Sequence, residues 1–293
     1  MTKSKFSGLG VVVVTPFLNN GDVDYRNLEQ LVESLIVGGC DYLVLLGTNS
    51  ETSTLTEEEK INIVKLVIHV NAGRLPLMLG LGGPSTQQVV EHLKNDDFTG
   101  IDAILSVTPY YNRPSQLGLY EHYREISYHS PLPVVMYNVP KRTGCCLETD
   151  TILQIARNCD NIIGIKEASG NMNHIMKLIK DKPDHFLVIS GDDAITLPLL
   201  AVGVDGLISV TANAFPKMVS KMVHLAMNGD FENAKLIHNI LLDITQLSLK
   251  EGNPAGIKAI LALQGKMGYY LRQPLSRVSL ELQQVLKEVV SFL

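Results

Sequence analysis

Short apolar runs alternate with helical patterns along most of this chain, and this alternation constrains the fold more than any other feature. The runs are residues 8–14, 42–46, 76–81, 102–107, 132–137, 161–165, 186–190 and 206–210. Nearly continuous apolar runs of this length are typical of strands that are buried on both faces of a parallel sheet. Eight such strand and helix units predict an α/β fold, a closed (β/α)8 barrel.

Signals for helices fill the segments between the runs. Leu28, Leu31 and Leu35 lie on one helical face, and Thr56 with Glu59 forms a capping box. After Asn213 the strand pattern stops and only helical patterns follow. We therefore expect a catalytic barrel over residues 1–225 and a helical C-terminal region over residues 226–293.

Charge and hydropathy exclude several classes of partner. The net charge is -5 and the 25 Lys and Arg residues form no long basic run, so we expect no nucleic acid partner. No apolar stretch reaches the ~20 residues that a membrane span needs, and the first run ends at Thr15-Pro16 as a strand would. The four cysteines lack metal-binding spacings. These features predict a cytoplasmic protein with no membrane partner.

Polar side chains follow the apolar runs at the point where each predicted strand ends. They include Thr48, Asn49, Tyr110, Tyr111, Tyr137, Arg142 and Lys166. Because the carboxyl ends of barrel strands meet on one rim, where active sites of this fold lie, we expect these side chains to lie together.

The residue types on this rim favour amine chemistry. The rim has no histidine and too few carboxylates for a zinc site, so we expect no metal and no cofactor. A lysine amine that burial keeps partly neutral condenses with carbonyl compounds to form a Schiff base. Lys166 is therefore the candidate nucleophile and Tyr137 the candidate proton carrier. Glu167, on the opposite face of an extended strand, is expected to be structural.

Motifs along the whole chain support one resemblance. "GTNSET", "TPYYNRPSQLGLY", "YNVPKRTG", "GIKEASG", "SGDDA" and "ISVTAN" occur in this order. With them the chain closely resembles the dihydrodipicolinate synthase family, one of the pyruvate-dependent class I aldolases that also include N-acetylneuraminate lyase. The resemblance implies condensation of pyruvate with aspartate 4-semialdehyde in lysine (diaminopimelate) biosynthesis.

The resemblance also implies roles for the rim residues. Lys166 would form the imine with pyruvate, Tyr137 would shuttle protons, and Thr48 would link Tyr137 to Tyr111 in a hydroxyl relay. Tyr111 would reach into a neighbouring subunit, which implies a homo-oligomer, either a dimer or a homotetramer. Arg142 would hold the carboxylate of the aldehyde substrate.

Further members of the family pattern complete the predicted binding site. Gly191 and Ile208 would contact the substrates through backbone groups. Asn49 and Ser50 stand where the family usually has Thr-Gly, so Asn49 occupies the position that helps to hold the keto-acid carboxylate. This departure leaves two alternatives: an aldolase or lyase that acts on a longer 2-keto acid, and a noncatalytic keto-acid binding protein.

Overall fold

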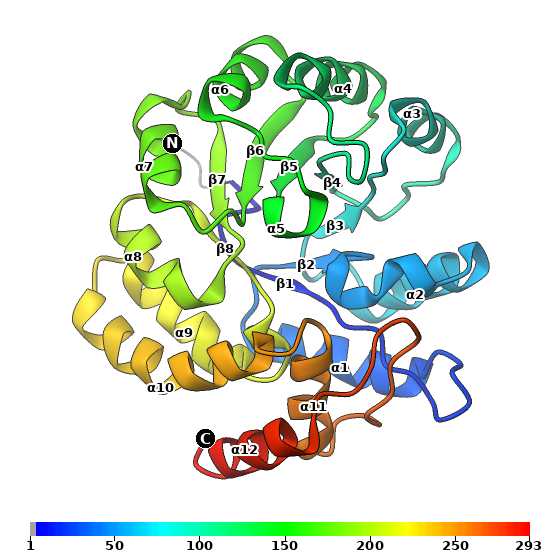
Figure 1. Cartoon of the computed structure of the whole chain (residues 1–293), viewed down its shortest axis with the longest axis vertical. Helices are drawn as coiled ribbons and strands as arrows, with labels where there is room; N and C mark the ends of the chain where they lie inside the picture. Colours follow the sequence, from blue (N-terminus) through cyan, green and yellow to red (C-terminus); the bar gives the residue numbers. More distant parts are fainter. Residues whose placement is uncertain (1–3) are drawn as a thin grey trace.

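The chain forms a closed barrel of parallel strands, which confirms the predicted fold (Figure 1). The computed structural model describes residues 4–293. Each strand pairs with the next one along the chain, and β8 pairs with β1 to close the ring. The strands are β1 (Gly8–Val12), β2 (Tyr42–Leu45), β3 (Leu77–Gly80), β4 (Ala103–Val107), β5 (Val134–Asn138), β6 (Ile162–Glu167), β7 (Leu187–Ser190) and β8 (Gly206–Ser209).

Helices connect the strands and surround the barrel (Figure 1). They are α1 (Tyr25–Val37), α2 (Glu57–Asn71), α3 (Thr86–Asn95), α4 (Gln116–His129), α5 (Pro140–Thr143), α6 (Thr149–Asn158), α7 (Met172–Asp181), α8 (Thr196–Ala201) and α9 (Pro216–Met227). Short 3-10 helices η1 (Thr48–Ser50), η2 (Thr52–Thr54), η3 (Asp193–Ile195) and η4 (Thr211–Asn213) follow β2, β7 and β8.

Local signals explain where the first helices begin and end. In α1 the side chain of Asp24 accepts a hydrogen bond from the backbone N–H of Asn27, and the helix ends at Gly38. In α2 the predicted capping box is present, because Thr56 and Glu59 each bond the other's backbone N–H. The capping box thus confirms the boundary that the sequence predicts for α2.

Apolar side chains form one layer inside the barrel and another between the strands and the helices. Alternation along β1 illustrates the division, since Val11 belongs to the outer layer and Val12 to the inner one. Phe6 and Tyr42 pack edge to face, with ring centroids 5.4 Å apart, at the amino-terminal end of the interior. Because these aromatic rings fill the amino-terminal end of the interior, space for a ligand site remains at the carboxyl end of the barrel.

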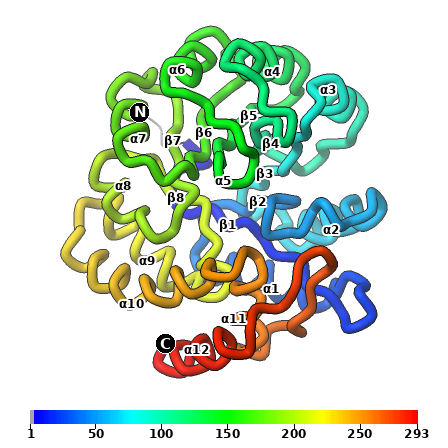
Figure 2. The backbone as a smooth tube through the Cα atoms, viewed as in Figure 1, coloured from blue at the N-terminus to red at the C-terminus, as the bar shows by residue number. Residues whose placement is uncertain are grey.

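Three helices follow α9: α10 (Phe231–Leu249), α11 (Ala255–Leu263) and α12 (Leu280–Val290). Figure 2 shows this segment, from yellow to red, on one side of the barrel, where α10 packs against α8 and α9. The division into a barrel (1–225) and a C-terminal region (226–293) stays a prediction. Within residues 4–293, no helix is both long enough and apolar enough to cross a membrane.

Candidate active site

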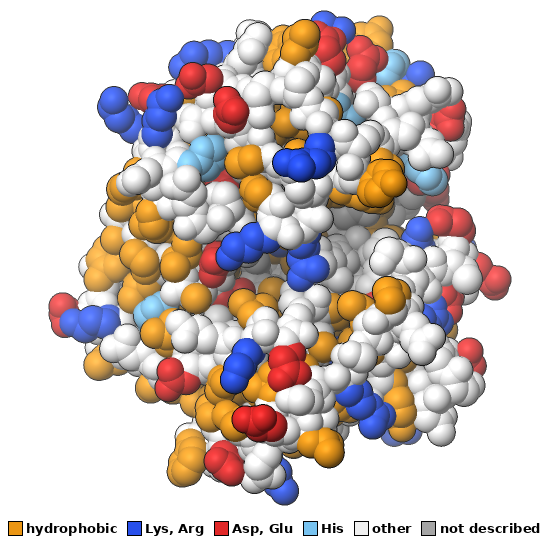
Figure 3. Space-filling view, in the orientation of Figure 1, with side chains coloured by type: hydrophobic (Ala, Val, Ile, Leu, Met, Phe, Trp, Pro, Cys, Tyr) orange, Lys and Arg blue, Asp and Glu red, His pale blue; other side chains and the backbone are white. Residues whose placement is uncertain are grey.

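A cavity opens at the carboxyl end of the barrel and holds several of the predicted residues. Its volume is about 370 Å³, and its wall includes Thr48, Tyr110, Tyr137, Arg142 and Lys166. The face drawn in Figure 3 is hollowed near its centre, with basic side chains beside the hollow. A cavity of this size with convergent polar groups suits a small-molecule ligand.

Lys166 lies within β6 rather than after it, because the strand continues to Glu167. Its side chain is only 4% exposed, and its Nζ lies 4.3 Å from the centroid of the Tyr137 ring. Among residues 4–293 no hydrogen bond or ion pair is made by this Nζ. A buried amine without an anionic partner is available for nucleophilic attack on a carbonyl group.

Tyr137 stands opposite Lys166 in the pairing of β5 with β6. Both side chains enter the cavity, as does Thr48 from η1. In the described part of the chain, no hydrogen bond joins the hydroxyls of Thr48 and Tyr137. The structure therefore brings the three groups to one cavity without forming the complete hydroxyl relay.

Tyr111 does not reach this cavity within one chain. Its side chain is 93% exposed, and its backbone has φ 74°, a left-handed conformation that is uncommon for a residue other than glycine. The preceding residue, Tyr110, lines the cavity instead. Other residues of the same chain therefore leave the side chain of Tyr111 almost fully exposed.

Arg142 lies in α5 and lines the cavity. Its Nη2 donates a hydrogen bond to the backbone carbonyl of Asn253, 3.2 Å away, which precedes α11. This contact holds the guanidinium at the rim while leaving its other N–H groups for a ligand.

Gly191 follows β7 and lies beside Lys166, whereas Ile208 lies in β8. A Cβ atom added at Gly191 would lie 3.0 Å from Cε of Lys166 and 2.8 Å from Cβ of Ala168, so a larger residue would displace the lysine stem. Ile208 is fully buried in the inner apolar layer. Gly191 therefore shapes the space around Lys166, while the substrate contacts of both residues stay a prediction.

The carboxamide of Asn49 makes its hydrogen bonds to other groups of the protein. Asn49 is 1% exposed, its Oδ1 accepts a hydrogen bond of 2.6 Å from Nδ2 of Asn253, and its Nδ2 donates to the carbonyl of Val12 at 3.4 Å. Its neighbour Ser50 donates to the carbonyl of Val13 at 2.7 Å. Protein groups occupy both side chains, and the binding of the keto-acid carboxylate by Asn49 stays a prediction.

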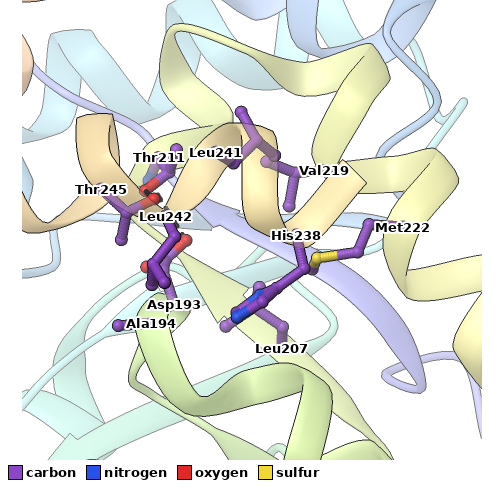
Figure 4. A pocket seen from close by; sticks show the side chains of 10 residues that line it. All are labelled: Asp193, Ala194, Leu207, Thr211, Val219, Met222, His238, Leu241, Leu242 and Thr245. Carbon is purple, nitrogen blue, oxygen red and sulfur yellow. Dashed lines mark hydrogen bonds between the residues drawn. The ribbon is translucent and has the colours of Figure 1, made fainter. Parts of the chain in front are cut away.

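A second hollow lies outside the barrel wall, between β8 and the helices α9 and α10 (Figure 4). Its volume is about 10 Å³, the space of about one water molecule, so it is too small for a substrate. Asp193 lines it and is not a simple helix-start residue, because its carboxylate accepts hydrogen bonds from Ser209, Val210 and Thr211. Burial raises the pKa of Asp193. The hollow therefore belongs to the packing of η3 against β8.

The fold and the cavity together define a class of enzyme. The parallel barrel holds a buried lysine that is unpaired within residues 4–293 and lies opposite a tyrosine at the carboxyl end. This arrangement is that of a class I aldolase-type barrel, in which an amine captures a carbonyl substrate. The sequence matches the Dihydrodipicolinate synthetase family over residues 5–293, and the chain belongs to that family.

Individual relatives agree with this assignment. The chain is 49% identical over 290 residues to a 4-hydroxy-tetrahydrodipicolinate synthase of Parabacteroides distasonis, covering 99% of this chain and 98% of the relative. A solved dihydrodipicolinate synthase of Thermotoga maritima is 35% identical, with a TM-score of 0.96 and 99% of each chain covered. A second solved structure, described as the first monomeric dihydrodipicolinate synthase variant, is 35% identical with a TM-score of 0.95, and the match covers 98% of this chain and 96% of that one.

Proposed function

We propose that this chain is a 4-hydroxy-tetrahydrodipicolinate synthase that condenses pyruvate with aspartate 4-semialdehyde in lysine (diaminopimelate) biosynthesis. The observation that carries the proposal is the buried Lys166 amine, unpaired among residues 4–293 and facing Tyr137 in a cavity of about 370 Å³. Relatives of this name that match nearly the whole chain support it.

The chemistry assigns a step to each side chain. The Nζ of Lys166 attacks C2 of pyruvate, and loss of water from the resulting carbinolamine gives an iminium. Loss of a proton from C3 gives an enamine, whose C3 adds to the aldehyde carbon of aspartate 4-semialdehyde. The amino group of the semialdehyde then attacks C2 and displaces Nζ of Lys166, which closes the ring and frees the lysine. Tyr137, beside the lysine, donates and accepts the protons that these steps move.

The remaining rim residues bind and relay. Thr48 passes protons toward Tyr137, and Arg142 holds the carboxylate of the aldehyde substrate with its free N–H groups. Gly191 and Ile208 present backbone groups to the substrates. Asn49 supports the turn that carries Thr48, and its backbone rather than its carboxamide faces the keto acid.

Tyr111 completes the relay from a second copy of the chain. Its 93% exposure is the observation that supports this assignment, because a phenol left in water by one chain is available to a neighbour. We infer a homo-oligomer, a dimer or a tetramer, and a cytoplasmic location for this enzyme of small soluble substrates.

An assay of the purified protein with pyruvate and aspartate 4-semialdehyde tests the proposal. We expect turnover without added metal or cofactor. N-acetylneuraminate and 2-keto-3-deoxygluconate serve as competing substrates, and faster cleavage of either would replace the synthase by a lyase of longer 2-keto acids. Binding of pyruvate without any turnover would favour a noncatalytic keto-acid binding protein.

Replacing Tyr137 by phenylalanine should lower kcat by about 10²-fold or more, because the phenolic proton carrier is lost while the ring stays packed. Steady-state kinetics with both substrates would measure the effect. Tyr123→Phe is a matched control, since Tyr123 is also buried but donates to the carbonyl of Ser106 outside the cavity. Turnover of Tyr137→Phe within a few-fold of the parent would reduce Tyr137 to a packing role.

Inhibition by L-lysine should be weak or absent. In many family members lysine binds near the turn after the second strand and at the start of the helix after the third, with an asparagine amide and a glutamate as ligands. Here Pro84 and Gln88 stand at those places, whereas Thr52 and Tyr110 remain suitable and line the cavity region. Losing one hydrogen bond and one charge-assisted contact weakens binding by about tenfold to a hundredfold.

Titration of L-lysine into the synthase assay measures this prediction. We expect half-inhibition at millimolar concentration or above. The double variant Pro84→Asn/Gln88→Glu should become more sensitive, which separates the two residues from other causes. Half-inhibition of the parent well below millimolar concentration would show that Pro84 and Gln88 do not weaken the site.

A further inference from the structure

A buried polar pair lies directly behind the two residues that face the cavity. In the pairing of β5 with β6, Tyr137 stands opposite Lys166 and the next pair is Asn138 with Glu167. Successive side chains of a strand point to opposite faces, so this second pair points away from the cavity toward α6 and α7. Nδ2 of Asn138 donates to Oε2 of Glu167 at 2.9 Å, which joins the two strands side chain to side chain.

The carboxylate of Glu167 is fully engaged although it is buried. Besides Asn138, it accepts a hydrogen bond of 2.7 Å from the backbone N–H of Ser169 on Oε1. Oε2 also lies 3.2 Å from Nε2 of His174, in α7. With Glu167 as a carboxylate, which only accepts, the Nε2–H of His174 is the donor in this contact. Three donors therefore fix the position of the side chain that follows Lys166.

A second layer of contacts holds these donors in place. Nδ1 of His174 lies 2.9 Å from Oγ1 of Thr149, at the start of α6. The Nε2–H tautomer of His174 gives a hydrogen bond to both ring nitrogens, since Nε2 then donates to Glu167 and Nδ1 accepts from the threonine hydroxyl. Oδ1 of Asn138 in turn accepts from the backbone N–H of Leu147 at 3.0 Å. The network thus ties the ends of β5 and β6 to the start of α6 and to α7.

The pairing of β5 with β6 is irregular before it reaches these residues. Val134 pairs with Ile162 but Val135 pairs with Gly164, so Ile163 has no partner residue and the register shifts by one. A shift of one residue exchanges the faces to which side chains point. The Asn138–Glu167 bond lies beyond this irregularity and opposes any return to the unshifted register, which would pair Tyr137 with another residue.

We propose that Glu167, held by Asn138 and His174, is a positioning residue that sets Lys166 opposite Tyr137. The inference rests on the proposed function, because it concerns the geometry of imine formation and proton transfer between these two groups. Misplacement of reacting groups by about 1 Å lowers rates by up to about 10²-fold.

Glu167→Gln tests the proposal with little change of volume. An amide offers one acceptor oxygen and one NH2 group, so the NH2 must face either the Ser169 N–H or the donors of Asn138 and His174. We expect kcat and the rate of imine trapping by borohydride to fall about tenfold to 10²-fold. The KM for pyruvate should change by less than about twofold, since no group that binds pyruvate is altered.

His174 provides a second variant and a rescue. His174→Leu removes one donor and should lower kcat in the same direction but less than Glu167→Gln, whereas His174→Gln, which can still donate to Glu167, should restore most of the rate. His224→Leu is the matched control, because Nε2 of His224 lies 2.8 Å from Oδ2 of Asp41 at the opposite end of the barrel. This control should keep the parent kcat even if its thermal midpoint falls.

The outcomes separate the two levels of the proposal. A parent protein that traps no pyruvate overturns the proposed function and this inference together. Trapping and turnover by the parent, with unchanged kcat in Glu167→Gln and His174→Leu, overturns the positioning role alone. A loss of kcat that His174→Gln fails to restore, or that His224→Leu reproduces, also overturns it.

Discussion

Borohydride added together with pyruvate should inactivate this protein and leave one reduced adduct per chain, on Lys166. Borohydride reduces an imine to a stable secondary amine, so the adduct records where the carbonyl was captured. Lys166 is the expected site because its amine lines the cavity, is 4% exposed and is unpaired within residues 4–293. Mass spectrometry of the digested protein locates the adduct.

Two other lysines serve as internal controls for this trapping. Lys258 is more deeply buried, but it is paired with Glu51 and does not line the cavity. Lys60 lines the cavity, but it is paired with Glu57 at 2.6 Å. Neither should be labelled. EDTA should change neither the inactivation nor the labelling of Lys166. Borohydride without pyruvate should leave no adduct. An adduct on either lysine, or none on Lys166, would contradict the Schiff-base mechanism.

Lys258→Met should lower the free energy of unfolding by about 3–5 kcal/mol, because it leaves the carboxylate of Glu51 buried without its cation. Both side chains of this ion pair have an exposed fraction of 0%. Nζ of Lys258 also donates to the carbonyl of Tyr270 at 3.1 Å and lies 4.2 Å from the centroid of the Phe17 ring. Denaturant unfolding at a fixed protein concentration would measure the change.

The double variant Glu51→Gln/Lys258→Met should recover part of this loss. Burial lowers the pKa of Lys258 to about 8, although the carboxylate of Glu51 acts to raise it. The cost of taking the Lys258 cation out of water is therefore larger than its attraction to Glu51. Removing both charges therefore removes the unpaired carboxylate that makes the single variant unstable. If Lys258→Met is as stable as the parent, or if the double variant is no better than the single one, the ion pair is not what holds α11 to the turn after β2.

Short-range patterns were sufficient to predict the barrel and the side chains that meet at its carboxyl end. The apolar runs predict the strands, and the capping box of Thr56 and Glu59 predicts the start of α2, because both depend on residues close together in the chain. The place of Lys166 and Tyr137 on one rim was predictable in the same way, since each lies at the end of an apolar run and strand ends of one barrel share one rim. Their catalytic roles stay a prediction that rests on the family resemblance.

The partners of the Asn49 side chain were not predictable from short-range patterns. From the sequence it stands in the turn that carries Thr48, and its carboxamide was expected at the substrate. In the structure it pairs with Asn253, 204 residues away, whose carbonyl also binds Arg142. No feature near Asn253 in the chain indicates this contact, because it forms only when the segment before α11 returns to the carboxyl end of the barrel.

The direction of a side chain in a strand depends on neighbouring residues, whereas its partners come from distant parts of the chain. Alternation along β6 predicts that Lys166 and Glu167 point to opposite faces, and local residues alone decide this. The shifted register with β5, the donors around Glu167 and the pairing of Glu51 with Lys258 across 207 residues depend on closure of the barrel and packing of the helices. Periodicity is a property of neighbouring residues, whereas the partner of a buried polar group is selected by the tertiary structure that removes it from water.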